Sequence, residues 1–165
     1  MQHVQTRSTT SALVLTAVLI ALATLFTMYT KIPVPGIRGY FNVGDVVIMT
    51  SALLLGRKYG AYIGAIGPAL ADLFLGYAVF VPITFVVKGI EGYLVGTVYN
   101  NKTTTSALAA TILGGIIIVA GYFIAEYFVF DLGVAIASIL TNAIQAVMSV
   151  IISMILYAIL RKRLG

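Results

Sequence analysis

Long apolar stretches separated by short polar connections run through almost the whole chain. A helix needs about 20 mainly apolar residues to cross a bilayer, and by this measure the pattern predicts six transmembrane helices. They lie at roughly 11–29, 43–56, 59–76, 80–98, 105–128 and 134–160. The second segment is short and almost abuts the third, so we expect a tight helical hairpin in which the short segment is tilted, partly re-entrant or buried by protein.

The composition agrees with this pattern. Hydrophobic residues make up 61% of the 165 residues and charged residues only 9%, and the mean hydropathy is +1.07. Five acids and ten bases are too few to cover the surface of a water-soluble fold of this size. The sequence therefore predicts an all-α integral membrane bundle, with one domain over residues 1–165.

The N-terminal segment resembles a cleavable signal peptide, because Arg7 precedes an apolar run that contains the small triplet Ala21-Leu22-Ala23. The apolar run continues to Met28, however, which makes it long enough to span a bilayer. We therefore expect the segment to remain as the first transmembrane helix.

The positions of the basic residues predict the orientation. If both termini are cytoplasmic, seven bases face the cytoplasm and two face outward, as the positive-inside rule requires. The seven are Arg7, Arg57, Lys58, Lys102, Arg161, Lys162 and Arg163, and the two are Lys31 and Arg38. An N-in, C-in topology follows, with Glu126 and Asp131 at the outer end of the fifth segment. The net charge of +5 does not indicate nucleic acid, because the bases form short clusters beside apolar runs.

The outer connection between the first two segments spans residues 30–42. It contains two prolines and two glycines, which forbid a continuous helix. We expect an ordered outer loop.

Several kinds of chemistry lack their residues. There is no cysteine and His3 is the only histidine, so we expect no metal site. The sequence contains no G-x-x-x-x-G-K-[ST], H-E-x-x-H or G-x-S-x-G motif. We therefore expect neither an enzyme nor a cofactor in this chain, and any ATP that drives transport would be used by partner subunits.

Small residues recur on two of the predicted helices. Ala17 and Ala21 are four apart on the first, and Gly60, Gly64 and Gly67 follow one another on the third. Such spacing lets helices approach closely in lipid. For the glycines we favour packing within the bundle, whereas the alanines fit either that role or a docking face for another membrane subunit.

Six polar or ionisable residues interrupt the apolar segments, and such groups face the bundle interior by default because they are costly in lipid. They are Asp45, Asp72, Lys88, Glu91, Asn142 and Gln145. Lys88 and Glu91 are three apart on one helix, so they either neutralise each other, with Asp72 as a possible third member, or bind a ligand. Asn142 and Gln145 suit either a polar heterocycle or a bond between helices.

Aromatic residues gather toward the outer ends of the helices. They include Tyr40, Phe41, Tyr77, Phe80, Tyr122, Tyr127 and Phe128. Their concentration fits an interfacial belt, and it also fits a stacking platform for a flat ring beneath the outer loop.

Three motifs between Gly39 and Gly96 resemble those of a known family. They are Asn42-Val-Gly44-Asp45, Ala69-Leu-Ala71-Asp72 and Lys88-Gly89-Ile-Glu91-Gly92. Together they resemble the substrate-binding S components of energy-coupling factor (ECF) vitamin transporters. The resemblance covers about a third of the chain directly, and the six-helix layout extends it over the remainder.

The resemblance implies a receptor in the cytoplasmic membrane of a prokaryote that binds one vitamin or precursor from outside. Family members dock on a transmembrane coupling protein that carries two cytoplasmic ATPase subunits, and Ala17 and Ala21 match the family's docking pattern on the first helix. The pocket residues that the resemblance implies are Tyr40, Asn42, Lys88, Glu91, Tyr122, Asn142 and Gln145.

Within the family, the chain looks closest to members for hydroxymethylpyrimidine, a thiamine precursor, or pyridoxine, and to a related group for riboflavin. It lacks tryptophan, which departs from the thiamine-binding members. The alternative is a self-sufficient ion-coupled carrier or channel in which Asp72, Lys88 and Glu91 form a relay.

Overall fold

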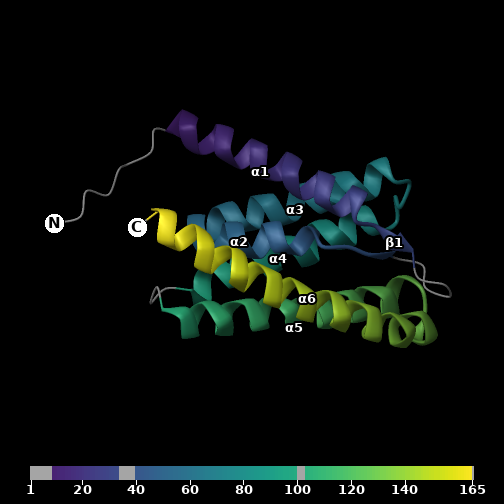
Figure 1. Ribbon diagram of the computed structural model, residues 1–165. Helices are drawn as coiled ribbons and strands as arrows, with labels where there is room; N and C mark the ends of the chain where they lie inside the picture. Colours follow the sequence, from purple (N-terminus) through teal and green to yellow (C-terminus); the bar gives the residue numbers. More distant parts are fainter. Residues whose placement is uncertain (1–8, 34–39, 100–102, 165) are drawn as a thin grey trace.

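The computed structural model of the protein describes residues 9–33, 40–99 and 103–164. Figure 1 shows a bundle of helices joined by short connections. The elements are α1 (Thr9–Tyr29), β1 (Ile32–Pro33), β2 (Tyr40–Phe41), α2 (Gly44–Leu55), α3 (Arg57–Phe74), α4 (Phe80–Val98), α5 (Thr104–Val129) and α6 (Leu132–Leu164). The prediction of six helices is confirmed, with boundaries that differ from the expected ones by a few residues.

The helices differ in how they meet the membrane. By length and composition, α1, α4, α5 and α6 can each cross a bilayer. In contrast, α2 has 12 residues, which is about 18 Å of helix and too short for a hydrocarbon core of about 30 Å. Ten of those residues are buried, so the short segment is enclosed by protein, one of the arrangements that the sequence predicted.

The predicted hairpin of α2 and α3 forms through a single residue. Gly56 lies between the two helices with a φ of 90°, a conformation that glycine adopts without steric cost. The chain reverses there, so α3 packs back along α2. In Figure 1 α2 lies inside the bundle, and it contacts α1, α3, α4 and α6.

Glycines let α3 approach its neighbours closely. A Cβ atom on Gly92 of α4 would lie 2.1 Å from the carbonyl oxygen of Gly60, and one on Gly64 would lie 2.2 Å from that of Lys88. A Cβ on Gly67 would lie 2.7 Å from the Cβ of Ala23 in α1. The prediction that these glycines pack inside the bundle is confirmed.

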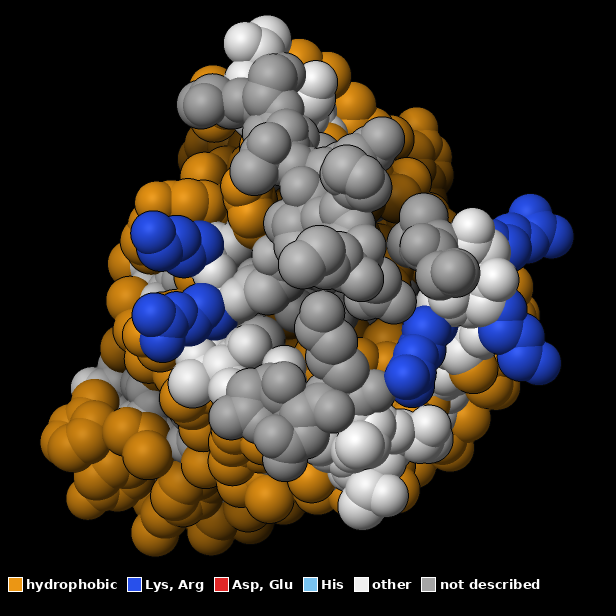
Figure 2. Space-filling view, turned by 90° about the vertical axis from the view of Figure 1, so that its left-hand side faces the viewer, with side chains coloured by type: hydrophobic (Ala, Val, Ile, Leu, Met, Phe, Trp, Pro, Cys, Tyr) orange, Lys and Arg blue, Asp and Glu red, His pale blue; other side chains and the backbone are white. Residues whose placement is uncertain are grey.

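The two ends of the bundle differ in charge. At the end that carries the C-terminus, the charged side chains visible among the described residues are all basic (Figure 2). They belong to the start of α3 and the end of α6, namely Arg57, Lys58, Arg161, Lys162 and Arg163. Arg7, Lys102 and Arg38 lie outside the described residues. This distribution is the one that an N-in, C-in topology requires, and the orientation itself stays a prediction.

The connection between α1 and α2 lies at the opposite end. Its described parts, β1 and β2, pair antiparallel, with Ile32 opposite Phe41 and Pro33 opposite Tyr40. Residues 34–39 lie outside the described part, so the expected order of the whole loop remains a prediction. The pairing brings the chain back to the start of α2.

Candidate functional site

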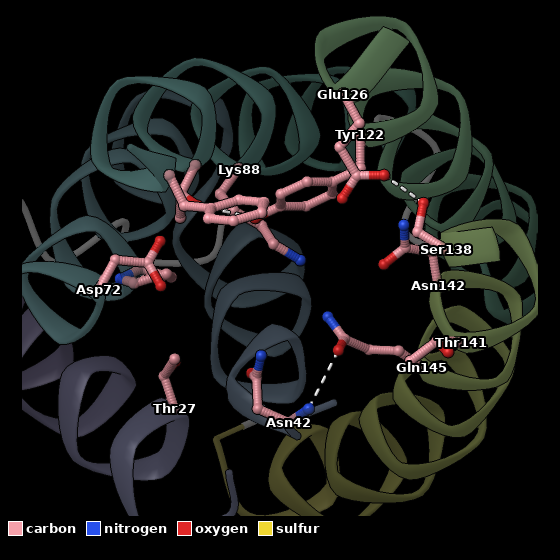
Figure 3. A pocket seen from close by; sticks show the side chains of 13 residues that line it. Thr27, Asn42, Asp72, Lys88, Tyr122, Glu126, Ser138, Thr141, Asn142 and Gln145 are labelled. Carbon is pink, nitrogen blue, oxygen red and sulfur yellow. Dashed lines mark hydrogen bonds between the residues drawn. The ribbon is translucent and has the colours of Figure 1, made fainter. Parts of the chain in front are cut away.

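A pocket opens in the half of the bundle that lies away from the basic end (Figure 3). Five of the six helices contribute side chains to it, together with Asn42 in the connection before α2. Its lining consists of Thr27, Asn42, Pro68, Asp72, Phe80, Thr84, Lys88, Tyr122, Glu126, Ser138, Thr141, Asn142 and Gln145. Most of these side chains are polar, although the surrounding helices are predominantly apolar.

Helical periodicity places these side chains on the inner faces of their helices. On α4 the lining residues Phe80, Thr84 and Lys88 follow one another at intervals of four. On α5 Tyr122 and Glu126 are also four apart. Residues at this spacing lie on one helix face, so each of these two helices presents a single face to the pocket.

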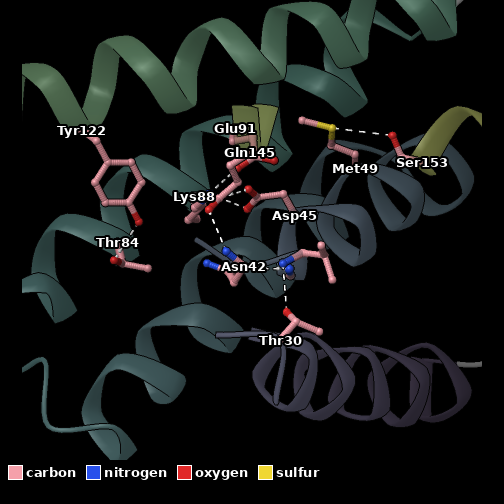
Figure 4. Close-up of polar contacts among 12 residues, drawn as sticks. Thr30, Asn42, Asp45, Met49, Thr84, Lys88, Glu91, Tyr122, Gln145 and Ser153 are labelled. Atoms are coloured by element: carbon pink, nitrogen blue, oxygen red, sulfur yellow. Dashed lines mark hydrogen bonds and ion pairs between the residues drawn. The ribbon is translucent and has the colours of Figure 1, made fainter. Parts of the chain in front are cut away.

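A buried ionic cluster adjoins the pocket through Lys88, which is part of the pocket lining (Figure 4). Lys88 forms ion pairs with Asp45 of α2 and with Glu91, whose Oε2 lies 3.6 Å from Nζ. All three side chains are at most 2% exposed. The predicted pairing of Lys88 with Glu91 is therefore present. The third member of the cluster is Asp45, whereas the sequence suggested Asp72. Asp72 lines the pocket instead.

Gln145 ties the cluster to the outer loop. Its Nε2 donates a hydrogen bond to Oδ2 of Asp45 at 2.7 Å, and its Oε1 accepts one from the backbone N–H of Asn42 at 3.0 Å. The side chain of Asn42 in turn accepts from the N–H of Gly44 at 2.8 Å. Both ends of the Gln145 amide are thus engaged, which corresponds to the predicted bond between helices, and the same residue lines the pocket.

Some side chains in the pocket wall have hydrogen-bond donors or acceptors available for a ligand. The hydroxyl of Thr27 is buried without a partner in the described part of the chain, and Asn142 points into the pocket between α5 and α6 (Figure 3). The hydroxyl of Tyr122 shares a hydrogen bond of 2.9 Å with Thr84. Its ring centre lies 5.4 Å from Nζ of Lys88, within the range of a cation–π contact.

Glu126 contributes a further carboxyl group to the pocket lining. Glu126 is 3% exposed and accepts a hydrogen bond from the hydroxyl of Ser138 (Figure 3). Glu126 takes part in neither of the ion pairs that Lys88 forms with Asp45 and Glu91. Glu126 is therefore a nearly buried acid whose partner is neutral.

The structure groups most of the predicted site residues. Asn42, Lys88, Tyr122, Asn142 and Gln145 line the pocket. Glu91 lies behind it, fully buried, and does not appear in its lining. Tyr40 belongs to β2, and its side chain lies outside the described part of the structure.

Several residues that line the pocket were not predicted as site residues from the sequence, among them Thr27, Asp72, Thr84, Glu126 and Ser138. A signal for some of them was present. Glu126 stands one turn after Tyr122, and Ser138 one turn before Asn142, so both share a face with a predicted site residue. The sequence placed Glu126 near the outer end of its helix and did not indicate which way its side chain faces; the structure shows that the side chain is buried.

The free space is small. The cavity measures about 40 Å³, and a water molecule needs about 10–15 Å³ on the same measure. It therefore has room for a few water molecules, and an aromatic ligand would require the lining to move apart.

The predicted docking residues lie on the outside of the bundle. Ala17 and Ala21 are both exposed, while Ala23, Thr24 and Thr27 of the same helix are buried. The hydroxyl of Thr24 donates to the carbonyl oxygen of Gly67 at 2.9 Å. The two alanines are thus free of packing inside the bundle.

Comparisons with known proteins agree with this geometry. A family model described as the S component of the ECF-type riboflavin transporter matches residues 7–162. An uncharacterized protein of Pyrococcus woesei is 41% identical over 86% of this chain and 96% of its own length. The thiamine precursor transporter HmpT of Lactococcus lactis is 28% identical over 89% of this chain and 83% of its own length.

Two solved structures share the fold at 20% sequence identity. One is the S component of a bacterial ECF transporter, with a TM-score of 0.78 over 94% of this chain and 98% of that chain. The other is the S component for biotin from an ECF-type ABC transporter, with a TM-score of 0.57 over 91% of this chain and 94% of that chain.

Proposed function

The chain belongs to the S components of ECF-type transporters, and on that premise we propose that it is the high-affinity substrate-binding subunit of an ATP-driven importer for one vitamin or precursor. The family consists of multi-pass membrane transport subunits. For this chain we add the substrate, the binding residues and the partners as proposals.

The observation that supports a binding role is the polar pocket. Polar groups in a membrane bundle are costly unless they are paired or serve a function. The ionic cluster of Lys88, Asp45 and Glu91 is paired internally. Thr27 and Asn142 have capacity to spare, and we propose that a ligand engages them.

For the substrate we propose hydroxymethylpyrimidine first, and pyridoxine or riboflavin after it. The cavity is small, so its lining would have to move less to admit a single ring than to admit the three fused rings of a flavin. The relative HmpT, whose name describes a thiamine precursor transporter, supports the same choice. Tyr122 and Phe80 supply aromatic surface at the pocket wall, which suits a flat ring.

For the partners we propose a transmembrane coupling protein with two cytoplasmic ATPase subunits, which would use the ATP. We propose that Ala17 and Ala21 form the contact with the coupling protein, because their small side chains lie exposed on the outer face of α1 and permit close helix approach. With the N-in, C-in orientation, the pocket would open to the outside.

Ala17→Trp and Ala21→Trp test this docking surface. Each should abolish ATP-driven uptake in cells and leave the dissociation constant of the purified chain unchanged, because both residues lie away from the pocket. Unchanged uptake in the double variant would remove these residues from the docking surface.

The experiment that tests the function is mass spectrometry of small molecules that copurify with the detergent-solubilised chain. Calorimetric titration with hydroxymethylpyrimidine, pyridoxine, riboflavin and thiamine follows. Nanomolar affinity for one of them supports the proposal. No binding to any, together with proton-coupled flux through the isolated chain in liposomes, would favour an ion-coupled carrier instead.

A further inference from the structure

We propose that Glu126 is the specificity-determining residue of the pocket and that it recognises the amidine edge of an aminopyrimidine, a ring nitrogen beside an exocyclic amino group. This inference rests on the proposed function. It names the chemical group that the pocket reads and the residue that reads it.

The first step is the state of the pocket's cation. Among the described residues of the lining, Lys88 is the one basic side chain, and it is bonded to Asp45 and lies 3.6 Å from Glu91. Two buried carboxyl groups thus surround a single ammonium group. Lys88 has no charge left over for an anionic ligand, so the described part of the lining offers no unpaired cation to a phosphate or carboxylate.

The second step is the hydrogen bonding of Glu126. The hydroxyl of Ser138 lies within reach of Glu126 and also of the carbonyl oxygen of Ala135, at 3.0 Å. A hydroxyl has one proton to donate, so Ser138 can satisfy only one of these acceptors at a time. A carboxyl group that is 3% exposed and has at most one donor for its two oxygens needs further partners.

The third step is the shape of the group that would satisfy it. A carboxyl group forms its strongest contacts with two parallel donors in one plane. An aminopyrimidine offers its amino N–H and its ring nitrogen side by side. One carboxyl oxygen accepts a hydrogen bond from the amino N–H. A single proton between the other carboxyl oxygen and the ring nitrogen forms the second hydrogen bond, whichever of these two atoms holds it.

The neighbours of Glu126 fit the rest of such a ring. Tyr122 stands one turn before it on α5 and brings an aromatic surface to the same wall. Ser138, which contacts Glu126, precedes Asn142 by four residues, about 6 Å along α6. Asn142 therefore lies close to Glu126 in the pocket lining (Figure 3), so a substituted ring that binds the carboxyl group can also contact the amide.

The test is a cycle that pairs a protein substitution with a ligand substitution, measured by calorimetry on the full chain in detergent. The ligands are hydroxymethylpyrimidine and the same ring with hydrogen in place of the amino group. Wild-type protein should lose on the order of 100-fold in affinity when the amino group is absent, because a carboxyl oxygen is left unpaired.

In Glu126→Met the same ligand change should cost less than about threefold, because the group that reads the amino function is gone. Methionine has a similar length, and Ser138 keeps its bond to Ala135, so folding should be preserved; Glu126→Ala repeats the measurement if it is not. Glu126→Gln should retain most of the preference, since an amide can form both hydrogen bonds to a neutral aminopyrimidine.

Asp131→Asn is the matched control. It removes an acidic charge at the same end of the bundle, from an exposed residue outside the pocket, and should leave the amino-group preference at its wild-type value. The inference would be overturned if wild type and Glu126→Met had an equal preference for the ligand with the amino group. It would also be overturned if Asp72→Asn removed that preference and Glu126→Met did not.

The same titrations separate this inference from the proposed function. A wild-type chain that binds none of the vitamins contradicts the function itself. A chain that binds riboflavin or pyridoxine tightly and the aminopyrimidine weakly retains the vitamin-binding function and overturns the role of Glu126.

Discussion

The interior of the bundle has two halves of different chemistry. Near the basic end it is filled by small and apolar side chains, with Gly60 and Gly92 in backbone contact and a cluster around Met49, Ala52 and Val95. Toward the other end the helices enclose the polar pocket. The first half can pack closely because little in it needs a polar partner, and we infer that it forms a rigid base for the second.

The boundary between the halves is the Lys88 cluster. Its charges are matched by residues from α2 and α4, and Gln145 of α6 closes it from the side. Pairing explains how charged groups persist in the middle of a membrane bundle. Substitutions at four residues can test this division, and their expected effects decrease in the order Lys88, Gly92, Asn142 and Ser153.

The largest effect is expected for Lys88→Met. The change leaves Asp45 and Glu91 buried without their cation, which should lower the free energy of unfolding by about 3–5 kcal/mol. Unfolding in mixed micelles would measure the loss. The double variant with Asp45→Asn should recover part of it, and a fully stable single variant would show that the two carboxyl groups do not need Lys88.

Gly92→Ala tests the close-packed half. The new Cβ would lie 2.1 Å from the carbonyl oxygen of Gly60, so α3 and α4 must separate, at a cost of about 1–3 kcal/mol or more. Gly89→Ala on the same helix is the control, because its Cβ would lie 3.2 Å from that of Ala65 and needs only a small adjustment. Thermal unfolding should rank the two variants, and equal stability would argue against close packing at Gly92.

Asn142→Ala tests the polar half through its ligand. The side-chain amide makes no hydrogen bond within the described part of the chain, so we expect little change in stability. If the amide binds ligand, its loss should weaken binding by about 1–3 kcal/mol, because a ligand group is left unpaired. Calorimetry would measure this, and an unaltered dissociation constant would give Asn142 a structural role only.

Ser153→Ala should have the smallest effect. Ser153 is buried beside Met49 on the close-packed side, with its hydroxyl 3.1 Å from the carbonyl oxygen of Val150 and 3.7 Å from the Met49 sulfur. A hydrogen bond of this kind contributes about 0.6 kcal/mol in membrane proteins. We expect a loss of stability below about 1 kcal/mol and no change in ligand affinity; a clear loss of binding would extend the functional region beyond the pocket.

Much of the fold could be predicted from the chain because lipid imposes simple rules. Helices in a membrane must satisfy their own backbone, so the lengths of the apolar runs located all six. The spacing of Gly60, Gly64 and Gly67 indicated close packing for the same reason. The partners of those glycines, Gly92, Lys88 and Ala23, could not be inferred, because contacts between distant segments depend on the order and tilt of the helices.

The site was predicted only in part. Sequence spacing paired Lys88 with Glu91, since neighbours on one helix follow from periodicity. It could not show that Asp45, 43 residues away, is the closer partner of Lys88, or that Gln145 joins Asp45 to Asn42. Each of these bonds connects segments that are far apart in the sequence.

The sequence by itself determined that the protein lies in a lipid bilayer, how many helices it has and which family it belongs to, because apolar length and short motifs are local properties of the chain. Only the tertiary structure decided which polar groups neutralise one another and which face the pocket. Glu126 shows the difference. Its place near a helix end gave its level along the bundle, whereas its burial beside Ser138 depends on how α5 packs against α6; helix rotation is set by packing on all sides at once, which no local pattern records.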